Sequence, residues 1–211
     1  MNPELTKYDN KAKGDEYEEL VAQYYANEGY IVIKNGFIAE KYDKGVDLIA
    51  IRLLETKAQH LDSNNKLSRN ILKITTTYEI ILIQCKRFES KSEYSLIVDT
   101  IETAQKNNKN QYSIEAIFKK MEEFESKSYI FTQASTLMQG NSKIKHYINS
   151  KIKYRLIVPH QECIDKSAYK YIYQKAKNNY FKHKFHIFEI KNQSVQKKDF
   201  KEIRKYFEET Q

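Results

Sequence analysis

The chain has 211 residues with 40% hydrophobic and 13% aromatic side chains, a composition that suits a folded core and argues against intrinsic disorder. No apolar run approaches the ~20 residues that a membrane helix needs, and the start of the sequence lacks the basic-then-apolar pattern of a signal peptide. Two cysteines are too few for a disulfide framework or a zinc site. We therefore expect a cytoplasmic protein with no membrane partner.

The formal net charge of +8 is unevenly distributed along the chain. Residues 141–211 carry 17 Lys and Arg against 7 Asp and Glu, whereas residues 1–140 carry 19 against 21. A basic C-terminal third beside a slightly acidic remainder suits a nucleic-acid partner. The alternative is a solvated, lysine-rich surface without a binding role.

The N-terminal part of the chain predicts one helix followed by two strands. Apolar residues at helical spacing predict a helix over 13–28, and Gly29 is the type of residue that ends one. Short apolar segments predict strands at 30–33 and 46–52, joined by a polar turn.

Residues 53–86 offer a less regular pattern. Residues 53–70 are polar and are interpreted as either a loop or an inserted hairpin arm. Residues 71–77 predict a strand that pairs with the next segment of the chain. The nearly continuous apolar run 79–86 is typical of a strand buried on both faces.

The remainder of the chain alternates between helical and strand patterns. In chain order we expect a helix at 91–107, a helix at 112–126, a strand at 129–132, a helix at 137–148, a strand at 154–158, a helix at 166–178, a strand at 185–190 and a helix at 197–209. Helices that alternate with buried strands predict an α/β fold with a central mixed β-sheet flanked by helices.

Polar residues at the ends of two apolar strands carry the candidate chemistry. Asp47 begins one strand, and Gln84 and Lys86 lie on one face at the end of the other. Burying such groups is costly unless they are paired. If the strands are neighbours, one cation can satisfy them, with oxygens from the Asp47 carboxylate, the Gln84 amide and the main-chain carbonyl of Cys85. This all-oxygen set suits Mg²⁺.

The same residues can serve phosphodiester hydrolysis. A metal ion lowers the pKa of a bound water and stabilises charge on the phosphate. Lys86 can orient or deprotonate that water, or neutralise the transition state. Glu18, on the first helix, is a further candidate that could hold a second-shell water or a second metal ion.

Four short motifs occur in a fixed order: Gly14-Asp15-Glu16-Tyr17-Glu18, Gly29-Tyr30, Gly45-Val46-Asp47 and Gln84-Cys85-Lys86-Arg87-Phe88. Together they resemble the Mrr-like branch of the PD-(D/E)XK nucleases. Residues 129–132, a following helix and a strand at Ile157 resemble the closing β-α-β portion of that branch. The gap between the third and fourth motifs is longer than the branch usually shows.

The resemblance implies a restriction-endonuclease-like core over residues 1–160, with an inserted hairpin or loop at about 53–78. Residues 161–211 match no pattern and are expected to be a basic α/β extension packed on that core. The resemblance further implies Mg²⁺, which Mn²⁺ can replace, and a catalytic role for Glu18, Asp47, Gln84 and Lys86.

The function implied is a metal-dependent endonuclease that hydrolyses double-stranded DNA in restriction or defence. A homodimer is expected, because cutting both strands usually takes two sites. A Holliday-junction or repair nuclease on the same core is one alternative. A non-catalytic nucleic-acid-binding module that uses the basic C-terminal part is the other.

Each candidate residue also has a purely structural interpretation. Asp47 can be a turn residue, Glu18 part of a solvated helix face, and Cys85 core filler rather than a nucleophile. Lys86 can mark the point where the strand leaves the core, with its stem buried and its charge in water.

Further along, the His183 and His186 pair is more typical of a basic surface than of a metal site. The tyrosines of the same region are more typical of helix packing than of base stacking; they are Tyr169, Tyr171, Tyr173 and Tyr180.

Overall fold

The computed structural model describes residues 3–35, 45–61, 71–87, 97–107, 112–127, 133–139, 142–177, 184–191 and 194–198. These residues form an α/β protein with a central seven-stranded sheet. The strand order is β1-β2-β3-β7-β8-β9, and β6 pairs with the N-terminal part of β7 on the edge that faces away from β3. The pairs β3–β7 and β7–β8 are parallel and the remaining pairs are antiparallel. The expected α/β class with a central mixed sheet is confirmed.

The helices are α1 (Pro3–Asn27), α2 (Ile101–Asn107), α3 (Ile114–Lys127) and α4 (Lys166–Ala176). The strands of the main sheet are β1 (Ile31–Lys34), β2 (Leu48–Leu61), β3 (Ile71–Cys85), β6 (Gln133–Gln139), β7 (Ser142–Val158), β8 (Phe185–Lys191) and β9 (Ser194–Lys198). A separate two-stranded sheet joins β4 (Ile97–Val98) to β5 (Tyr112–Ser113), and a 3₁₀ turn spans Gln161–Cys163.

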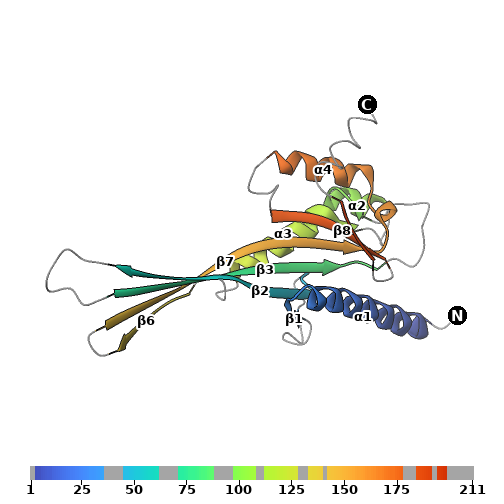
Figure 1. Cartoon of the computed structure of the whole chain (residues 1–211). Coiled ribbons are helices and arrows are strands. Elements are labelled where there is room, and N and C mark those ends of the chain that lie inside the picture. The colour runs from blue at the N-terminus through green and yellow to red at the C-terminus, as the bar shows by residue number, and fades with distance from the viewer. Residues whose placement is uncertain are drawn as a thin grey trace.

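Helices lie on both faces of the main sheet, with α1 on one side and α2, α3 and α4 on the other (Figure 1). Alternation along β3 divides its buried residues between the two cores. Ile81 and Ile83 pack with Tyr17 and Val21 of α1. Leu82 belongs to the larger core beneath α3 and α4.

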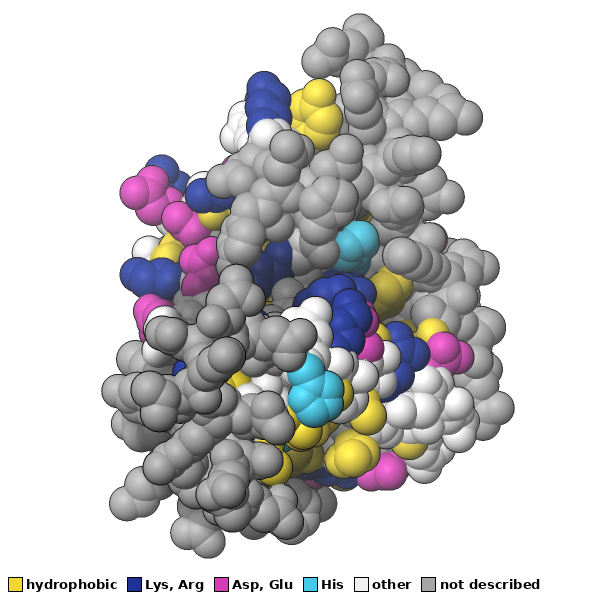
Figure 2. Space-filling view, turned by 60° about the vertical axis from the view of Figure 1, so that its left-hand side comes forward, with side chains coloured by type: hydrophobic (Ala, Val, Ile, Leu, Met, Phe, Trp, Pro, Cys, Tyr) yellow, Lys and Arg dark blue, Asp and Glu magenta, His cyan; other side chains and the backbone are white. Residues whose placement is uncertain are grey.

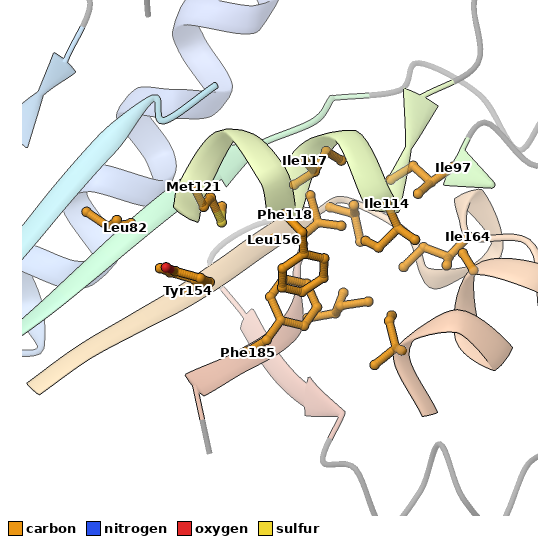
Figure 3. Close-up of a cluster of buried hydrophobic side chains, with 14 of the residues drawn as sticks. Leu82, Ile97, Ile114, Ile117, Phe118, Met121, Tyr154, Leu156, Ile164 and Phe185 are labelled. Carbon is orange, nitrogen blue, oxygen red and sulfur yellow. The ribbon is translucent and has the colours of Figure 1, made fainter. Parts of the chain in front are cut away.

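The core beneath α3 is the larger of the two. Figure 3 shows Met121 and Phe118 of α3 directed at Tyr154, Leu156 and Phe185 of the sheet. The rings of Phe118 and Phe185 are 3.9 Å apart between centroids. Burying each of these side chains contributes about 1.5–3 kcal/mol, so the apolar stripe of α3 fixes that helix on the sheet.

Several expected elements are confirmed. The first helix ends at Asn27, and Gly29 follows with φ 83°, a conformation that favours glycine. The helix also begins earlier than expected, at Pro3. The helices expected at 112–126 and 166–178 and the strand expected at 185–190 correspond to α3, α4 and β8. Asp165 caps α4, because its carboxylate accepts a hydrogen bond from the backbone N–H of Ser167 at 2.8 Å.

Two interpretations of strand and helix were wrong. Residues 71–77 do not fold back on 79–86: both lie in the single strand β3, paired along its length with β2 and β7. The expected helix at 137–148 is instead the end of β6 and the start of β7. A glycine such as Gly140 costs about 1 kcal/mol inside a helix, and pairing of residues 143–148 with β3 and of residues 137–139 with β7 overrides the weak helical pattern. The closing β-α-β portion suggested by the resemblance therefore lacks its helix in the described residues.

The long strands extend beyond the helices as a projection, seen on the left of Figure 1. We define this arm as residues 55–61 of β2, 71–77 of β3, 133–139 of β6 and 142–149 of β7. The register is continuous, with Ile74 of β3 opposite Ala58 of β2 and His146 of β7. Of the two interpretations of residues 53–70, the hairpin arm holds for the described residues 53–61.

The remaining expectations are met in part. Of the helix expected at 91–107, the described residues form β4 and then α2 from Ile101. Lys197 and Lys198, expected to begin a helix, end strand β9, and the rest of 197–209 lies outside the described residues. The strand expected at 129–132 also lies outside them. Beyond residue 160, β8 joins the main sheet beside β7, and α4 contributes to the core beneath it.

Candidate active site

Asp47 and Gln84 face each other across the junction of β2 and β3. Leu48 pairs with Ile83, and the backbone N–H of Asp47 donates to the carbonyl of Ile83 at 2.8 Å. Asp47 is 8% exposed and Gln84 is 3% exposed. The antiparallel register therefore buries the Asp47 carboxylate against the Gln84 amide, where β2 begins and β3 ends.

Two N–H donors converge on the Asp47 carboxylate. Its Oδ2 accepts hydrogen bonds from Gln84 Nε2 at 2.5 Å and from the backbone N–H of Cys85 at 2.6 Å. Gln84 Nε2 also lies 3.4 Å from the carbonyl oxygen of Cys85. These hydrogen bonds offset much of the free-energy cost of burying the Asp47 and Gln84 side chains, the cost noted from the sequence.

Asn35 holds the segment that carries Asp47. Its side-chain amide donates to the carbonyl of Val46 at 2.8 Å, and its backbone N–H donates to the carbonyl of Asp47 at 2.9 Å. Asn35 is 5% exposed. Nothing in the sequence indicates this role, because Asn35 follows a short strand where a polar residue is ordinary.

Lys120 of α3 passes beside the same cluster. A Cβ atom added to Gly45 would lie 2.5 Å from Lys120 Cδ, 2.9 Å from Lys120 Cβ and 3.3 Å from Gln84 Oε1. The lysine stem therefore crosses Gly45 next to the Gln84 amide, and Gly45 itself has φ 73°. Lys120 was not predicted from the sequence, where it looks like any exposed lysine of an amphipathic helix.

Glu18 of α1 interacts electrostatically with the cluster. Burial, together with the negative charges of Asp47 and Asp15, raises the pKa of its carboxyl to about 7, against the lowering effect of Lys34 and Lys86. A carboxyl with a pKa near neutrality exchanges a proton at physiological pH. The structure thus places this sequence candidate within the electrostatic range of Asp47.

Lys86 follows the last residue of β3, and its side chain is half-buried. Its backbone N–H donates to the carbonyl of Ile157 at 2.9 Å, and its Nζ lies 4.8 Å from the centroid of the Tyr112 ring. An ammonium over an aromatic face is held in place while it stays charged. Its charge also acts on Glu18 and Cys85.

Cys85 is buried, and this burial raises the pKa of its thiol well above the ordinary value, with the charges of Asp47 and Glu18 adding to the rise. A thiol that keeps its proton is a poor nucleophile. Its side chain packs in the core beneath α1. Only its main-chain groups face the cluster.

The chemistry of the donor set fits a hard cation such as Mg²⁺. Asp47, the Gln84 amide and the Cys85 carbonyl provide oxygens from converging groups, and Mg²⁺ retains several waters beside one or two carboxylates. In the structure, Gln84 Nε2 points at the two acceptor oxygens, so the amide must turn over to offer Oε1 to an ion. No group of three or more His, Cys, Asp or Glu side chains among the described residues could hold a metal ion.

The other sequence candidates lie elsewhere. His186 is half-buried, with its ring stacked on Phe188 at 6.4 Å and 10°, and His183 lies outside the described residues. Tyr169 is buried in the core beneath α4, and Tyr171 packs against that core, as expected of helix-packing tyrosines.

No family model, no curated protein and no solved structure matches the chain. Within the described ranges, no helix is both long enough and apolar enough to span a membrane.

Proposed function

We propose that the protein is a Mg²⁺-dependent endonuclease with a PD-(D/E)XK-type site, acting on double-stranded DNA. The observation that carries the proposal is the convergence of three groups: the Gln84 amide donates to both the Asp47 carboxylate and the Cys85 carbonyl, and the Cys85 N–H donates to the same carboxylate. The ordered motifs that resemble the Mrr-like branch support the same function. A role in restriction or defence follows from that resemblance alone.

Each residue has a role in this proposal. Asp47, Gln84 and the Cys85 carbonyl hold the ion, which when bound activates water and neutralises phosphate charge. Glu18 accepts a proton from the attacking water, since its pKa of about 7 suits a general base. Lys86 places a positive charge beside the phosphate as negative charge develops on it.

Lys120 supplies a second cation beside the cluster. Its stem lies against Gly45 and the Gln84 amide, so its ammonium can reach a phosphate bound at Asp47. In this proposal Lys120 binds substrate and leaves the proton transfer to Glu18. We further propose that the enzyme acts as a homodimer, because cutting both strands requires two such sites.

The test is cleavage of supercoiled plasmid in Mg²⁺ or Mn²⁺ by wild type, Asp47→Asn and Glu122→Gln. Asp47→Asn keeps an oxygen for the Cys85 N–H but removes the anionic ligand, and should lower the rate at least ~100-fold. Glu122→Gln removes an exposed carboxylate from α3 and should cut like wild type. Equal cleavage by wild type and Asp47→Asn would refute the assigned site, and duplex binding without cleavage would favour a binding module.

A further inference from the structure

The two faces of the arm differ sharply in charge. Pairing across β2, β3 and β7 places residues of one row on the same side of the sheet, and successive rows alternate between sides. One face carries no formally charged side chain among its described residues, which on β2, β3 and β7 are Thr56, Ala58, His60, Leu72, Ile74, Thr76, Ser142, Ile144, His146 and Ile148. The opposite face, which we call the basic face, carries Lys57, Lys73 and Lys145.

The lysines of the basic face are adjacent. Lys73 and Lys145 are direct cross-strand partners, and Lys57 lies one row away opposite Thr75. Glu55 lies on the same face and pairs with Lys57 at 2.8 Å. Like charges directly opposite each other destabilise a sheet. A polyanion bound across Lys73 and Lys145 would offset that repulsion.

The chemistry of this face favours nucleic acid over a protein partner. Protein interfaces centre on buried apolar or aromatic anchors, whereas the residues between these lysines include Gln59 and Thr75. The aromatic side chain of the face, Tyr147, is covered on one side by Lys73, whose Nζ lies 5.1 Å from the ring centroid. Single-stranded nucleic acid is usually bound by open aromatic rings, so a duplex backbone suits this face better.

The arm is also well placed to meet a large partner. It extends past the helices in Figure 1, and Figure 2 turns it toward the viewer, with Lys and Arg side chains beside histidine and hydrophobic side chains on that surface. Lys73 and Gln84 occupy the same strand, so at ~3.3 Å per residue they lie about 36 Å apart. The arm therefore presents a surface separate from the candidate active site.

We propose that the basic face of the arm binds the phosphate backbone of double-stranded nucleic acid through Lys73, Lys145 and Lys57. The choice of partner rests on the proposed function, but the contact is independent of the metal cluster. Binding through lysine–phosphate contacts displaces counterions, so its salt dependence reports the number of contacts. Base sequence should have little effect, because such contacts carry no sequence information.

The test is fluorescence anisotropy with a duplex of about 24 base pairs in chelator, so that binding is measured without cleavage. Lys73→Gln/Lys145→Gln should bind at least ~10-fold more weakly at low salt and reduce the slope of log K against log[salt] by about 1.8. The matched control Lys106→Gln/Lys119→Gln removes two exposed lysines from α2 and α3, outside the basic residues 141–211, and should bind like wild type.

The outcomes separate the two proposals. Unchanged affinity and slope in the arm variant, confirmed as folded by circular dichroism, would overturn the arm proposal whatever the plasmid assay shows. Failure of wild type to bind duplex, or a change in self-association without a change in duplex binding, would overturn it as well. Lysine-dependent duplex binding by a protein that never cuts would sustain the arm proposal and refute the nuclease.

Discussion

Glycine-to-alanine substitutions at three positions test the packing around the candidate site. Gly14 lies within α1 and has nothing within 4 Å of an added Cβ. Gly29 has φ 83° but equally open surroundings. Gly45 combines φ 73° with contacts of 2.5 and 2.9 Å to Lys120 and 3.3 Å to Gln84 Oε1. Alanine at the three positions therefore separates helix propensity, backbone strain and steric overlap.

The expected magnitudes follow from these surroundings. Gly14→Ala should stabilise the protein by about 0.5–1 kcal/mol, the gain of alanine over glycine in a helix. Gly29→Ala should cost about 1 kcal/mol, because left-handed strain of ~1–2 kcal/mol is partly offset by a less flexible unfolded chain. Gly45→Ala should cost about 2–4 kcal/mol, since overpacking adds ~1–3 kcal/mol to the same strain.

Urea unfolding at neutral pH measures all three free energies on one scale. Mn²⁺ affinity provides a second readout, because displacement of Lys120 and Gln84 by a methyl group at position 45 should weaken ion binding, whereas Gly29→Ala should leave it unchanged. A Gly45→Ala variant no less stable than Gly29→Ala would show that Lys120 does not pack against Gly45.

Three further predictions concern single carboxylates. Burial alone would raise the pKa of Glu79, but hydrogen bonds from Lys153, Tyr30 and Arg52 lower it to about 2, so its stabilisation is present above pH ~4.5 and is lost as pH falls towards 2. Glu79→Gln should therefore cost about 1–2 kcal/mol at pH 7 and little at pH 2, as followed by acid and thermal unfolding. The pKa of Glu18 is shifted in the opposite direction, to about 7, so the contribution of this group to stability is fully present below pH ~4.5 and is lost as pH rises to ~7. Above that pH a buried negative charge destabilises the fold. Glu18→Gln should therefore raise the melting temperature at pH 8 and barely change it at pH 4. Asp165→Ala removes the cap of α4 and should cost about 0.5–2 kcal/mol by urea unfolding, with no change in Mn²⁺ affinity.

The sequence predicted those parts of the fold whose signals are local. The apolar stripe of α3 needs only helical spacing, and Gly29 marks the end of α1 through its own backbone conformation. The approach of Asp47 to Gln84 was also expected, because each is polar at the end of an otherwise apolar strand. The helix signals lie within a few residues of the features they predict, whereas the approach of Asp47 to Gln84 was inferred from two polar strand ends 37 residues apart.

The arm and Lys120 depend on contacts between distant segments. Residues 137–148 have a weak helical pattern, but residues 143–148 pair with β3, about seventy residues earlier in the chain, and residues 137–139 pair with β7. Lys120 reaches the candidate site only because the other side of α3 is fixed in the core, so its own sequence context contains no signal. Both features follow from tertiary packing rather than local propensity.

Divalent-cation binding by the cluster around Asp47 is the property on which the proposed nuclease activity depends. Isothermal titration of metal-free protein with Mn²⁺ tests this directly, with Asp47→Asn and Glu122→Gln measured in parallel. We expect one ion bound per chain by wild type and Glu122→Gln, and at least ~10-fold weaker binding by folded Asp47→Asn. No binding by wild type, or equal affinity in Asp47→Asn, would contradict the proposed site.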